Sequence, residues 1–251
     1  MLRKVCVTSS VVTNIRTIVI IPAYHEEGKV GKVVTCILND EYNARFIDEV
    51  LVVDDGSRDK TKIEAERAGA TVISHKRNRG VSEAIRTGIE YAVKKKYDVC
   101  VIMGADTQDD PSEIKKLVKP ILNGECDFVQ GSRYLKGQRT VDMPVSRSIT
   151  TRIFTLLFRL SSGFPATDAS NGFRAFKTDI FKKIEIPANL GKWDLEPYLY
   201  LQAVKKGLRV KEVPVTKKYD LQKGFSKMQP ITSWISAASP MIKEILHLQK
   251  S

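Results

Sequence analysis

Short runs of aliphatic and β-branched residues recur along the first half of the chain, and each is followed by a segment with helical spacing. The runs are Thr17–Pro22, Glu49–Val53, Ala70–Ser74, Val99–Met103 and Asp127–Gln130. The predicted helices between them are Glu27–Leu38, Lys60–Ala68, Val81–Lys96 and Pro111–Leu122. Strands alternating with helices of this length build βαβ units. The sequence therefore predicts an α/β fold with a mostly parallel central sheet flanked by helices.

The length of 251 residues is enough for one large core. No stretch reaches about 18 consecutive apolar residues, so no segment is expected to span a bilayer. The N-terminus has a basic start but no sustained apolar run. We expect residues 1–16 to be a leader before the first strand, not a signal peptide.

The net charge of +12 points to anionic partners such as a nucleotide, a phosphate, nucleic acid or an anionic membrane. The basic excess is concentrated between Arg133 and Leu160 and between Ala203 and Ser251. Aromatic residues do not alternate with these basic residues, and no helix-turn-helix pattern is present. A nucleic-acid-binding module is therefore disfavoured.

Polar residues follow four of the predicted strands. The segments are Pro22–Glu26, Asp54–Ser57, Gly104–Gln108 and Gly131–Tyr134, of which the first three are acidic and the last is basic. Parallel α/β sheets bind ligands at the carboxyl ends of their strands. Neither a G-x-G-x-x-G nor a G-x-x-x-x-G-K-[ST] motif is present, which disfavours dinucleotide and P-loop enzymes.

The segment VIMGADTQDDP, residues 101–111, has the oxygen ligands that a hard cation prefers. In an extended chain Gly104, Asp106 and Gln108 share a face. One carboxylate, one amide oxygen, water and substrate phosphate oxygens suffice for Mg²⁺ or Mn²⁺. Asp109 and Asp110 are instead expected to cap the helix that opens at Pro111.

Seven motifs in this order resemble family 2 glycosyltransferases of the GT-A fold. The resemblance is strongest to the branch that makes polyprenyl- or dolichyl-phosphate hexoses (mannose or glucose). The motifs are IPAYHE (21–26), VDDGS (53–57), ADTQ (105–108), GSRY (131–134), NGFR (171–174), GLRVKEVP (207–214) and GFSKM (224–228). The resemblance implies a Rossmann-like nucleotide-sugar-binding domain at 17–228.

The resemblance also implies roles for single residues. The nucleotide sugar is expected at Pro22, Tyr24, Glu26, Val53, Asp55, Gly104, Ala105, Asp106, Arg133 and Lys227. The acceptor is expected at Ser132, Arg174, Ser226 and Lys227. Asp106 and Gln108 match the metal ligands, and Asp106, Arg133 and Asp194 are the candidate catalytic residues.

Three positions depart from the family pattern. Gly104 replaces the usual first Asp, and this change is expected to affect either the affinity for the metal ion or the choice of donor. His25 replaces an Asn. Leu221 stands where relatives often have Arg, so a neighbouring lysine (Lys217, Lys218 or Lys223) is expected to supply the cation.

The expected reaction is inverting transfer of a hexose from a GDP- or UDP-linked donor to a polyprenyl or dolichyl phosphate. A phosphate acceptor is already anionic near pH 7 and needs little help from a base. A hydroxyl acceptor on a glycan is the alternative, and it needs a base such as Asp194 or Glu196. A non-catalytic protein that binds nucleotide or nucleic acid is a weaker alternative.

Two basic, apolar segments predict contact with an anionic membrane surface. Residues 144–160 interleave arginines with large apolar residues, and residues 229–251 are expected to form an amphipathic helix. For the second helix, membrane contact and homodimer formation are equally compatible with the pattern. We expect a peripheral enzyme on the cytoplasmic face of a membrane.

Overall fold

The structure is a computed structural model that describes residues 15–136, 140–219 and 232–248. Its main sheet has seven strands in the order β3-β2-β1-β4-β7-β5-β8. The strands are β1 (Thr17–Ala23), β2 (Glu49–Asp54), β3 (Thr71–Ser74), β4 (Val99–Ile102), β5 (Phe128–Ser132), β7 (Arg174–Lys177) and β8 (Val210–Pro214). All neighbouring pairs are parallel except those of β7, which runs antiparallel to β4 and β5. The predicted α/β fold with a mostly parallel sheet is therefore confirmed.

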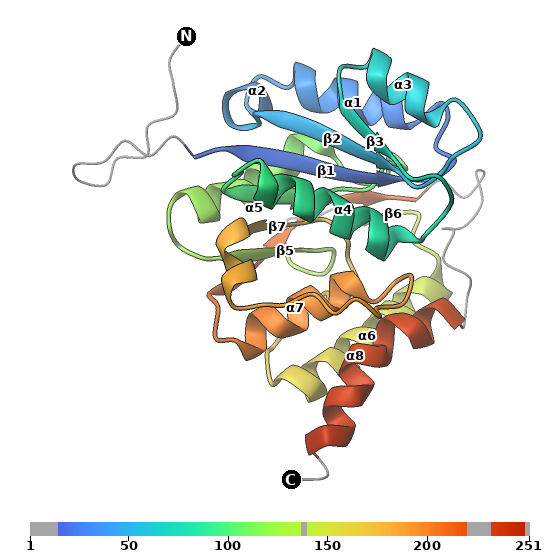
Figure 1. The fold of residues 1–251 in the computed structure, drawn as a ribbon. Coiled ribbons are helices and arrows are strands. Elements are labelled where there is room, and N and C mark those ends of the chain that lie inside the picture. The colour runs from blue at the N-terminus through green and yellow to red at the C-terminus, as the bar shows by residue number, and fades with distance from the viewer. Residues whose placement is uncertain (1–14, 137–139, 220–231, 249–251) are drawn as a thin grey trace.

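Helices cover both faces of this sheet (Figure 1). The helices are α1 (Val30–Asn39), α2 (Asn43–Phe46), α3 (Thr61–Arg67), α4 (Val81–Lys94), α5 (Ile114–Leu122), α6 (Val145–Ser162), α7 (Leu195–Lys205) and α8 (Thr232–Leu248). Two 3₁₀ turns, η1 (Pro111–Glu113) and η2 (Thr178–Lys182), and a small parallel pair, β6 (Thr140–Val141) with β9 (Lys217–Lys218), complete the described elements. The predicted helix at Pro111 begins as a 3₁₀ turn. The proline is tolerated at its first position because the N–H that it lacks has no helical partner there.

Alternate residues of the central strands enter two separate cores. On β1, Ile18 and Ile20 belong to the core that also contains side chains of α4, α6, α7 and α8, whereas Val19 and Ile21 belong to the core that contains side chains of α1 and α5. These four side chains have no exposed surface. Side chains of a strand alternate between faces, so a continuous apolar run marks a strand that is buried on both.

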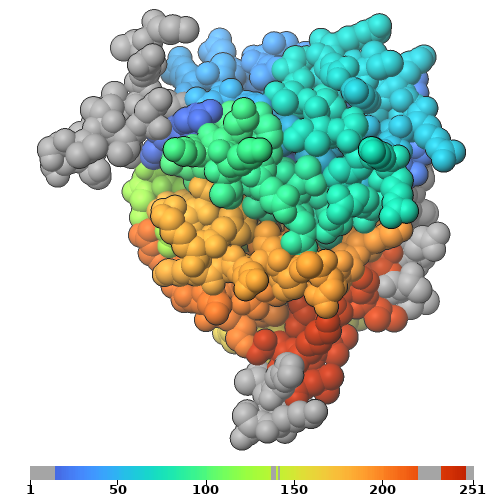
Figure 2. Space-filling view, in the orientation of Figure 1, coloured from blue at the N-terminus to red at the C-terminus, as the bar shows by residue number. Residues whose placement is uncertain are grey.

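Helix α8 lies against α6 and α7 and projects from the rest of the molecule at its C-terminal end (Figures 1 and 2). Lys205 of α7 forms an ion pair with Glu244 of α8. Among the described residues, no helix is both long and apolar enough to cross a membrane.

Candidate active site

A cleft of about 1340 Å³ opens at the carboxyl edge of the sheet. Most of the residues predicted from the sequence line it: Pro22, Tyr24, Glu26, Asp55, Gly104, Ala105, Asp106, Gln108, Arg133 and Arg174. They meet there because β1, β2, β4 and β5 all end at this edge, and the antiparallel β7 begins there. Ser226 and Lys227 lie outside the described residues.

Asp55, at the end of β2, organises the part of the cleft around the 77–80 loop. Its carboxylate contacts His75 Nδ1 at 2.7 Å and accepts hydrogen bonds from the backbone amides of Arg79 at 2.9 Å and Gly80 at 2.7 Å. The next residue, Gly56, has φ +78°, and a Cβ there would lie 2.6 Å from the Arg77 carbonyl carbon. Asp55 therefore fixes the 77–80 loop against the end of β2.

Val53, predicted to contact the nucleotide, does not line the cleft. Its side chain has no exposed surface and belongs to the core between the sheet and α4. The strand is still regular at this position, so the side chain points into the core rather than toward the ligand edge.

The loop after β4 places Asp106 and Gln108 on the cleft wall. The chain does not stay extended, because β4 ends at Ile102 and Thr107 has a left-handed φ of +65°. The backbone amide of Gln108 donates a hydrogen bond to Asp106 Oδ1 at 3.1 Å. Alternation along a strand was therefore the wrong reason for grouping these two residues, although both reach the cleft.

The oxygen ligands of this loop fit a hard divalent cation that also binds substrate oxygens. Asp106 supplies one carboxylate and Gln108 one amide oxygen. No group of three or more His, Cys, Asp and Glu residues with metal-binding geometry occurs in the part of the chain that the structure describes. A cation held here would therefore need further oxygens from water or from a bound ligand.

The two acidic residues predicted as helix caps have different roles. Asp110 does cap η1, since its carboxylate accepts from the Ser112 amide at 3.0 Å. Asp109 does not, and that prediction is wrong. Its buried carboxylate forms an ion pair of 2.9 Å with Lys217 Nζ from β9.

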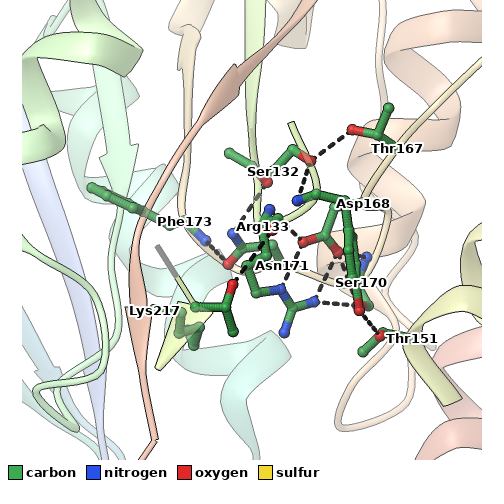
Figure 3. Close-up of polar contacts among 12 residues, drawn as sticks. Ser132, Arg133, Thr151, Thr167, Asp168, Ser170, Asn171, Phe173 and Lys217 are labelled. Carbon is green, nitrogen blue, oxygen red and sulfur yellow. Dashed lines mark hydrogen bonds and ion pairs between the residues drawn. The ribbon is translucent and has the colours of Figure 1, made fainter. Parts of the chain in front are cut away.

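Arg133 follows β5 and forms a buried ion pair with Asp168 (Figure 3). Its Nε and Nη2 donate to the two carboxylate oxygens at 2.7 and 2.8 Å. The remaining contacts are to Tyr219 and Ser170 at 2.7 and 2.6 Å. Burial alone would raise the pKa of Asp168, but the guanidinium outweighs it and holds that pKa below its usual range. Every guanidinium nitrogen is thus engaged within the protein.

Two predicted acceptor residues, Ser132 and Arg174, are also buried. Ser132 is hydrogen-bonded to the Thr167 hydroxyl at 2.6 Å and does not line the cleft. Arg174 lines the cleft, but its guanidinium donates to backbone carbonyls of Asn171, Gly172 and Glu196. Burial lowers the pKa of Arg174. Arg174 therefore ties the 171–172 loop to the start of α7.

Asp194 lies away from the cleft, and the structure gives its carboxylate a different set of partners. It accepts from the Gly191 amide at 2.9 Å and from the hydroxyls of Ser236 and Ser239 on α8 at 2.5 and 3.2 Å. Glu196, in contrast, lines the cleft. It stands so close to Gly172 that a Cβ there would be 2.7 Å from Glu196 Oε1.

Sequence reasoning did not assign four residues that line the cleft: Arg147, Phe154, Trp193 and Trp234. The Nε of Arg147 is buried without a hydrogen-bond partner among the described residues, and its guanidinium lies 5.6 Å from the centre of the Tyr219 ring. Phe154 and Trp234 pack edge to face at 5.4 Å. The apolar residues of α6 were visible in the sequence, but which of them face inward depends on how α6 and α8 pack.

Comparison with known proteins agrees with this geometry. The model of the family described as glycosyl transferase family 2 matches residues 18–185. UDP-N-acetylglucosamine--dolichyl-phosphate N-acetylglucosaminyltransferase of Methanococcus voltae is 30% identical over 213 residues, which cover 78% of this chain and 83% of that protein. Polyprenol monophosphomannose synthase of Mycolicibacterium smegmatis is 29% identical over 208 residues, covering 80% and 77%.

Among solved structures, glucosyl-3-phosphoglycerate synthase from Mycobacterium tuberculosis, in complex with Mn²⁺, UDP and phosphoglyceric acid, shares the fold. The TM-score is 0.68 at 20% identity, with 92% of this chain and 78% of that chain covered. The match to the family model spans more than half of the chain and includes the strand ends that form the cleft. The chain belongs to glycosyl transferase family 2 and is a glycosyltransferase of the GT-A fold.

Proposed function

We propose that the protein transfers a hexose from a GDP- or UDP-linked donor to a polyprenyl or dolichyl phosphate at a membrane surface. The observation that carries this proposal is a cleft that combines two kinds of lining. Asp55, Asp106 and Gln108 line it with carboxylate and amide oxygens, and Phe154, Trp193 and Trp234 line it with aromatic rings. The named activities of the relatives from Methanococcus voltae and Mycolicibacterium smegmatis, both on lipid-linked phosphates, support the same acceptor class.

On the donor side, Asp106 and Gln108 are the residues that would hold Mg²⁺ or Mn²⁺. Such a cation, when bound, supplies positive charge to the leaving diphosphate. Glu26 and Asp55 lie at the neighbouring strand ends, where the nucleoside is expected. Arg133, locked to Asp168, keeps the 168–170 loop in place and acts as a positioning residue rather than as a free clamp.

On the acceptor side, Arg147 has the guanidinium best suited to receive the lipid phosphate. Its Nε is buried and unpaired among the described residues, and a buried donor without a partner is costly unless a ligand satisfies it. The acceptor oxygen attacks the anomeric carbon, a new C–O bond forms, and the bond to the nucleotide diphosphate breaks with inversion. The aromatic residues that line the same cleft can hold the first apolar units of the lipid.

The outer faces of α6 and α8 give the proposed membrane surface. Large apolar side chains on α6 are exposed at spacings of three and four residues: Val145, Ile149, Ile153, Leu156 and Leu160. On α8, which packs beside α6, the exposed apolar residues are Ile235, Ile242 and Leu246. Exposed apolar faces with nearby arginines suit the interface of an anionic membrane. This supports peripheral attachment to a membrane surface, which we take to be the cytoplasmic face, and a homodimer through the same faces is the competing explanation.

The test is a panel of GDP- and UDP-sugars incubated with a polyprenyl phosphate and Mg²⁺ or Mn²⁺, scored for a sugar–lipid product. We expect one donor to give product, and we expect Asp106→Ala to abolish it without unfolding the protein. The matched control is Asp110→Ala in the same loop. It removes the η1 cap, costs about 1 kcal/mol of stability, and keeps the activity. Full activity in Asp106→Ala would refute the donor-site assignment.

Transfer to a hydroxyl acceptor is the second candidate function. Such a reaction needs a base, and Glu196 is a better candidate for that base than Asp194 because Glu196 lines the cleft. Glu196→Gln separates the two acceptor classes. Loss of about two or more orders of magnitude in kcat would indicate a hydroxyl acceptor that needs a base. An anionic phosphate acceptor predicts that most of the activity survives this change.

A further inference from the structure

Lys217, at the start of β9, places a buried ammonium on the donor side of the cleft. Its side chain is 11% exposed, and the partner carboxylate of Asp109 is 1% exposed. The Nζ–Oδ1 distance is 2.9 Å. Asp106, the predicted metal ligand, is also close enough to act on Lys217 electrostatically. Burial by itself would lower the pKa of Lys217, but Asp109 and then Asp106 outweigh burial and raise it, so the group is a permanent cation at neutral pH.

The backbone around Lys217 is fixed to the loop that carries Asp106. The Lys218 amide donates to the Gln108 carbonyl at 2.9 Å, and Lys217 forms an antiparallel bridge with Asp109. One residue earlier, the amide of Thr216 donates to the buried Glu113 carboxylate at 2.6 Å. The ammonium is therefore held in place beside Asp106 rather than carried on a free surface lysine.

Gly104 removes a carboxylate that would help to hold a divalent ion, and this gives the Lys217 ammonium a use near the diphosphate. A Cβ built on Gly104 would lie 3.2 Å from Asp106 Oδ1 and 3.4 Å from Asp109 Oδ2. A carboxylate at position 104, as in the family pattern, would therefore face two others and add to the need for a divalent ion. This chain has instead one carboxylate fewer and one ammonium. Lys217 thus places one ammonium beside the carboxyl groups of Asp106 and Asp109 before any metal or diphosphate binds.

We propose that Lys217 is a donor-binding residue that supplies part of the positive charge for the diphosphate, and that it reduces the dependence of donor binding on a divalent ion. The proposal rests on the proposed function only in taking the donor to be a nucleotide diphosphate sugar. It is independent of the acceptor. In bound donor the ammonium keeps Asp109 on one side and offers a second N–H to a phosphate oxygen, as lysine can donate three hydrogen bonds.

A purely structural role for the ion pair is the alternative, and a double variant separates the two. Lys217→Met alone leaves the buried Asp109 carboxylate without its partner and is expected to destabilise the fold. Asp109→Asn with Lys217→Met removes both charges, so the fold is expected to be retained. Asp109→Asn alone removes the ion-pair partner of the ammonium, while the neighbouring Asp106 still favours its charged form. Lys211→Met, at an exposed lysine paired with Glu125, is the control for loss of one positive charge elsewhere.

The experiment is calorimetric titration of each purified full-length variant with inorganic pyrophosphate, UDP and GDP, in EDTA and in Mg²⁺. We expect wild type, Asp109→Asn and Lys211→Met to bind pyrophosphate and one nucleotide in EDTA. We expect the double variant, with an unchanged circular dichroism spectrum, to bind them at least about tenfold more weakly, the size of one lost charge-assisted hydrogen bond. Mg²⁺ should then improve binding by a larger factor in the double variant than in wild type.

Equal affinities of wild type and double variant in EDTA would overturn the proposal, as would a wild-type protein that binds none of the three ligands without metal. An equal improvement by Mg²⁺ in both proteins would overturn the claim about metal dependence. Binding that depends on Lys217, combined with failure to form any sugar–lipid product, would leave this inference standing and refute the proposed acceptor. The two proposals therefore fail in different measurements.

Discussion

At the scale of single residues, the ion pair of Arg133 and Asp168 is almost completely withdrawn from water, with side-chain exposures of 1% and 0%. Removing one partner of such a pair leaves a buried charge unpaired, which typically costs about 3–5 kcal/mol. We expect Asp168→Ala to lower the free energy of unfolding by about this amount, measured by urea denaturation. Asp179→Ala, at an exposed pair with Lys182, should change it by less than about 0.5 kcal/mol.

The contrary result would be a stable Asp168→Ala protein that has lost activity. That would return Arg133 to the role first predicted, a cation acting directly on substrate. The test is specific to Arg133, because both its Nε and its Nη2 donate to the single carboxylate of Asp168, while its Nη1 contacts the Tyr219 hydroxyl.

The sequence predicted the position of side chains that directly follow β2 and β4, and it missed contacts whose partner is distant in sequence. Asp55 and Asp106 reach the cleft because the end of a parallel strand fixes their place. Asp109 was expected to act locally, as a cap, but its partner Lys217 is 108 positions away. The partner of Arg133 is likewise 35 positions away. Pairings of this kind depend on the assembled fold and leave no local pattern in the sequence.

At the scale of elements, the attachment of α8 depends on a few polar contacts with α7 and the segment before it. Ser236 and Ser239 donate to the buried Asp194, and Ala237 and Met241 pack into the core. We expect Ser236→Ala with Ser239→Ala to increase the amide hydrogen exchange of α8 by about tenfold, because each lost hydrogen bond to a buried carboxylate costs about 1 kcal/mol or more. Mass-spectrometric exchange of α8, with α5 as the internal reference, measures this effect.

Activity gives a separate readout of this contact. Because Asp194 lies outside the cleft lining, a phosphate-acceptor enzyme should keep much of its activity as Asp194→Asn. Exchange that remains at the wild-type rate in the double serine variant would show that apolar packing alone holds α8.

The exposed faces of α6 and α8 lead to a second prediction at this scale. Ile149→Glu with Ile153→Glu should weaken binding to vesicles of anionic phospholipid by about tenfold or more, because both side chains are more than half exposed and would enter the apolar boundary of the bilayer. Vesicle co-sedimentation measures it. Ile63→Glu, an exposed isoleucine on α3, is the matched control and should have no effect.

Sedimentation without vesicles distinguishes the competing occupant of these faces. Wild-type dimers that dissociate in the Ile149→Glu/Ile153→Glu variant, with vesicle binding unchanged, would assign the surface to a second copy of the chain. The helices themselves were predicted from apolar spacing, and both are confirmed in the described residues. How the two helices pack against each other was not predictable from the sequence. That packing determines which part of each apolar face is covered.

At the scale of the whole molecule, acid should weaken the far edge of the sheet through Asp127. Arg209 and then Lys177 donate to this carboxylate, joining the starts of β5 and β8 to the end of β7, and they hold the pKa of Asp127 well below its usual value. A carboxylate with a lower pKa in the folded state stabilises the fold above its unfolded pKa of about 4. This contribution is lost as the pH falls toward the folded pKa.

We therefore expect the free energy of unfolding of the wild type to fall between about pH 4 and pH 2, and to fall less steeply in Asp127→Asn. Urea denaturation at a series of pH values measures both slopes. Asp179→Asn, at an exposed ion pair, should keep the wild-type slope. Identical slopes in wild type and Asp127→Asn would mean that other groups account for acid unfolding.

The sheet order itself was only partly accessible from the sequence. The alternation of strands and helices over the first five strands predicted the parallel part, but β7 is a strand of only four residues without a βαβ signal. It enters between β4 and β5, antiparallel to both. The place of β7 between β4 and β5 depends on pairing between strands that are far apart in the sequence. A short stretch of sequence therefore does not predict it.

The insertion of β7 limits how this enzyme can be recombined with its relatives. A chimaera that takes the segment after β5 from another family member would graft a foreign β7 directly onto the backbones of both β4 and β5. The two parents would then have to agree in register at Val99–Ile102 and at Phe128–Gln130 before any hybrid could form a sheet. The segment after β5 therefore cannot be exchanged as an independent unit, and specificity is better changed by point substitutions along the cleft than by swapping segments.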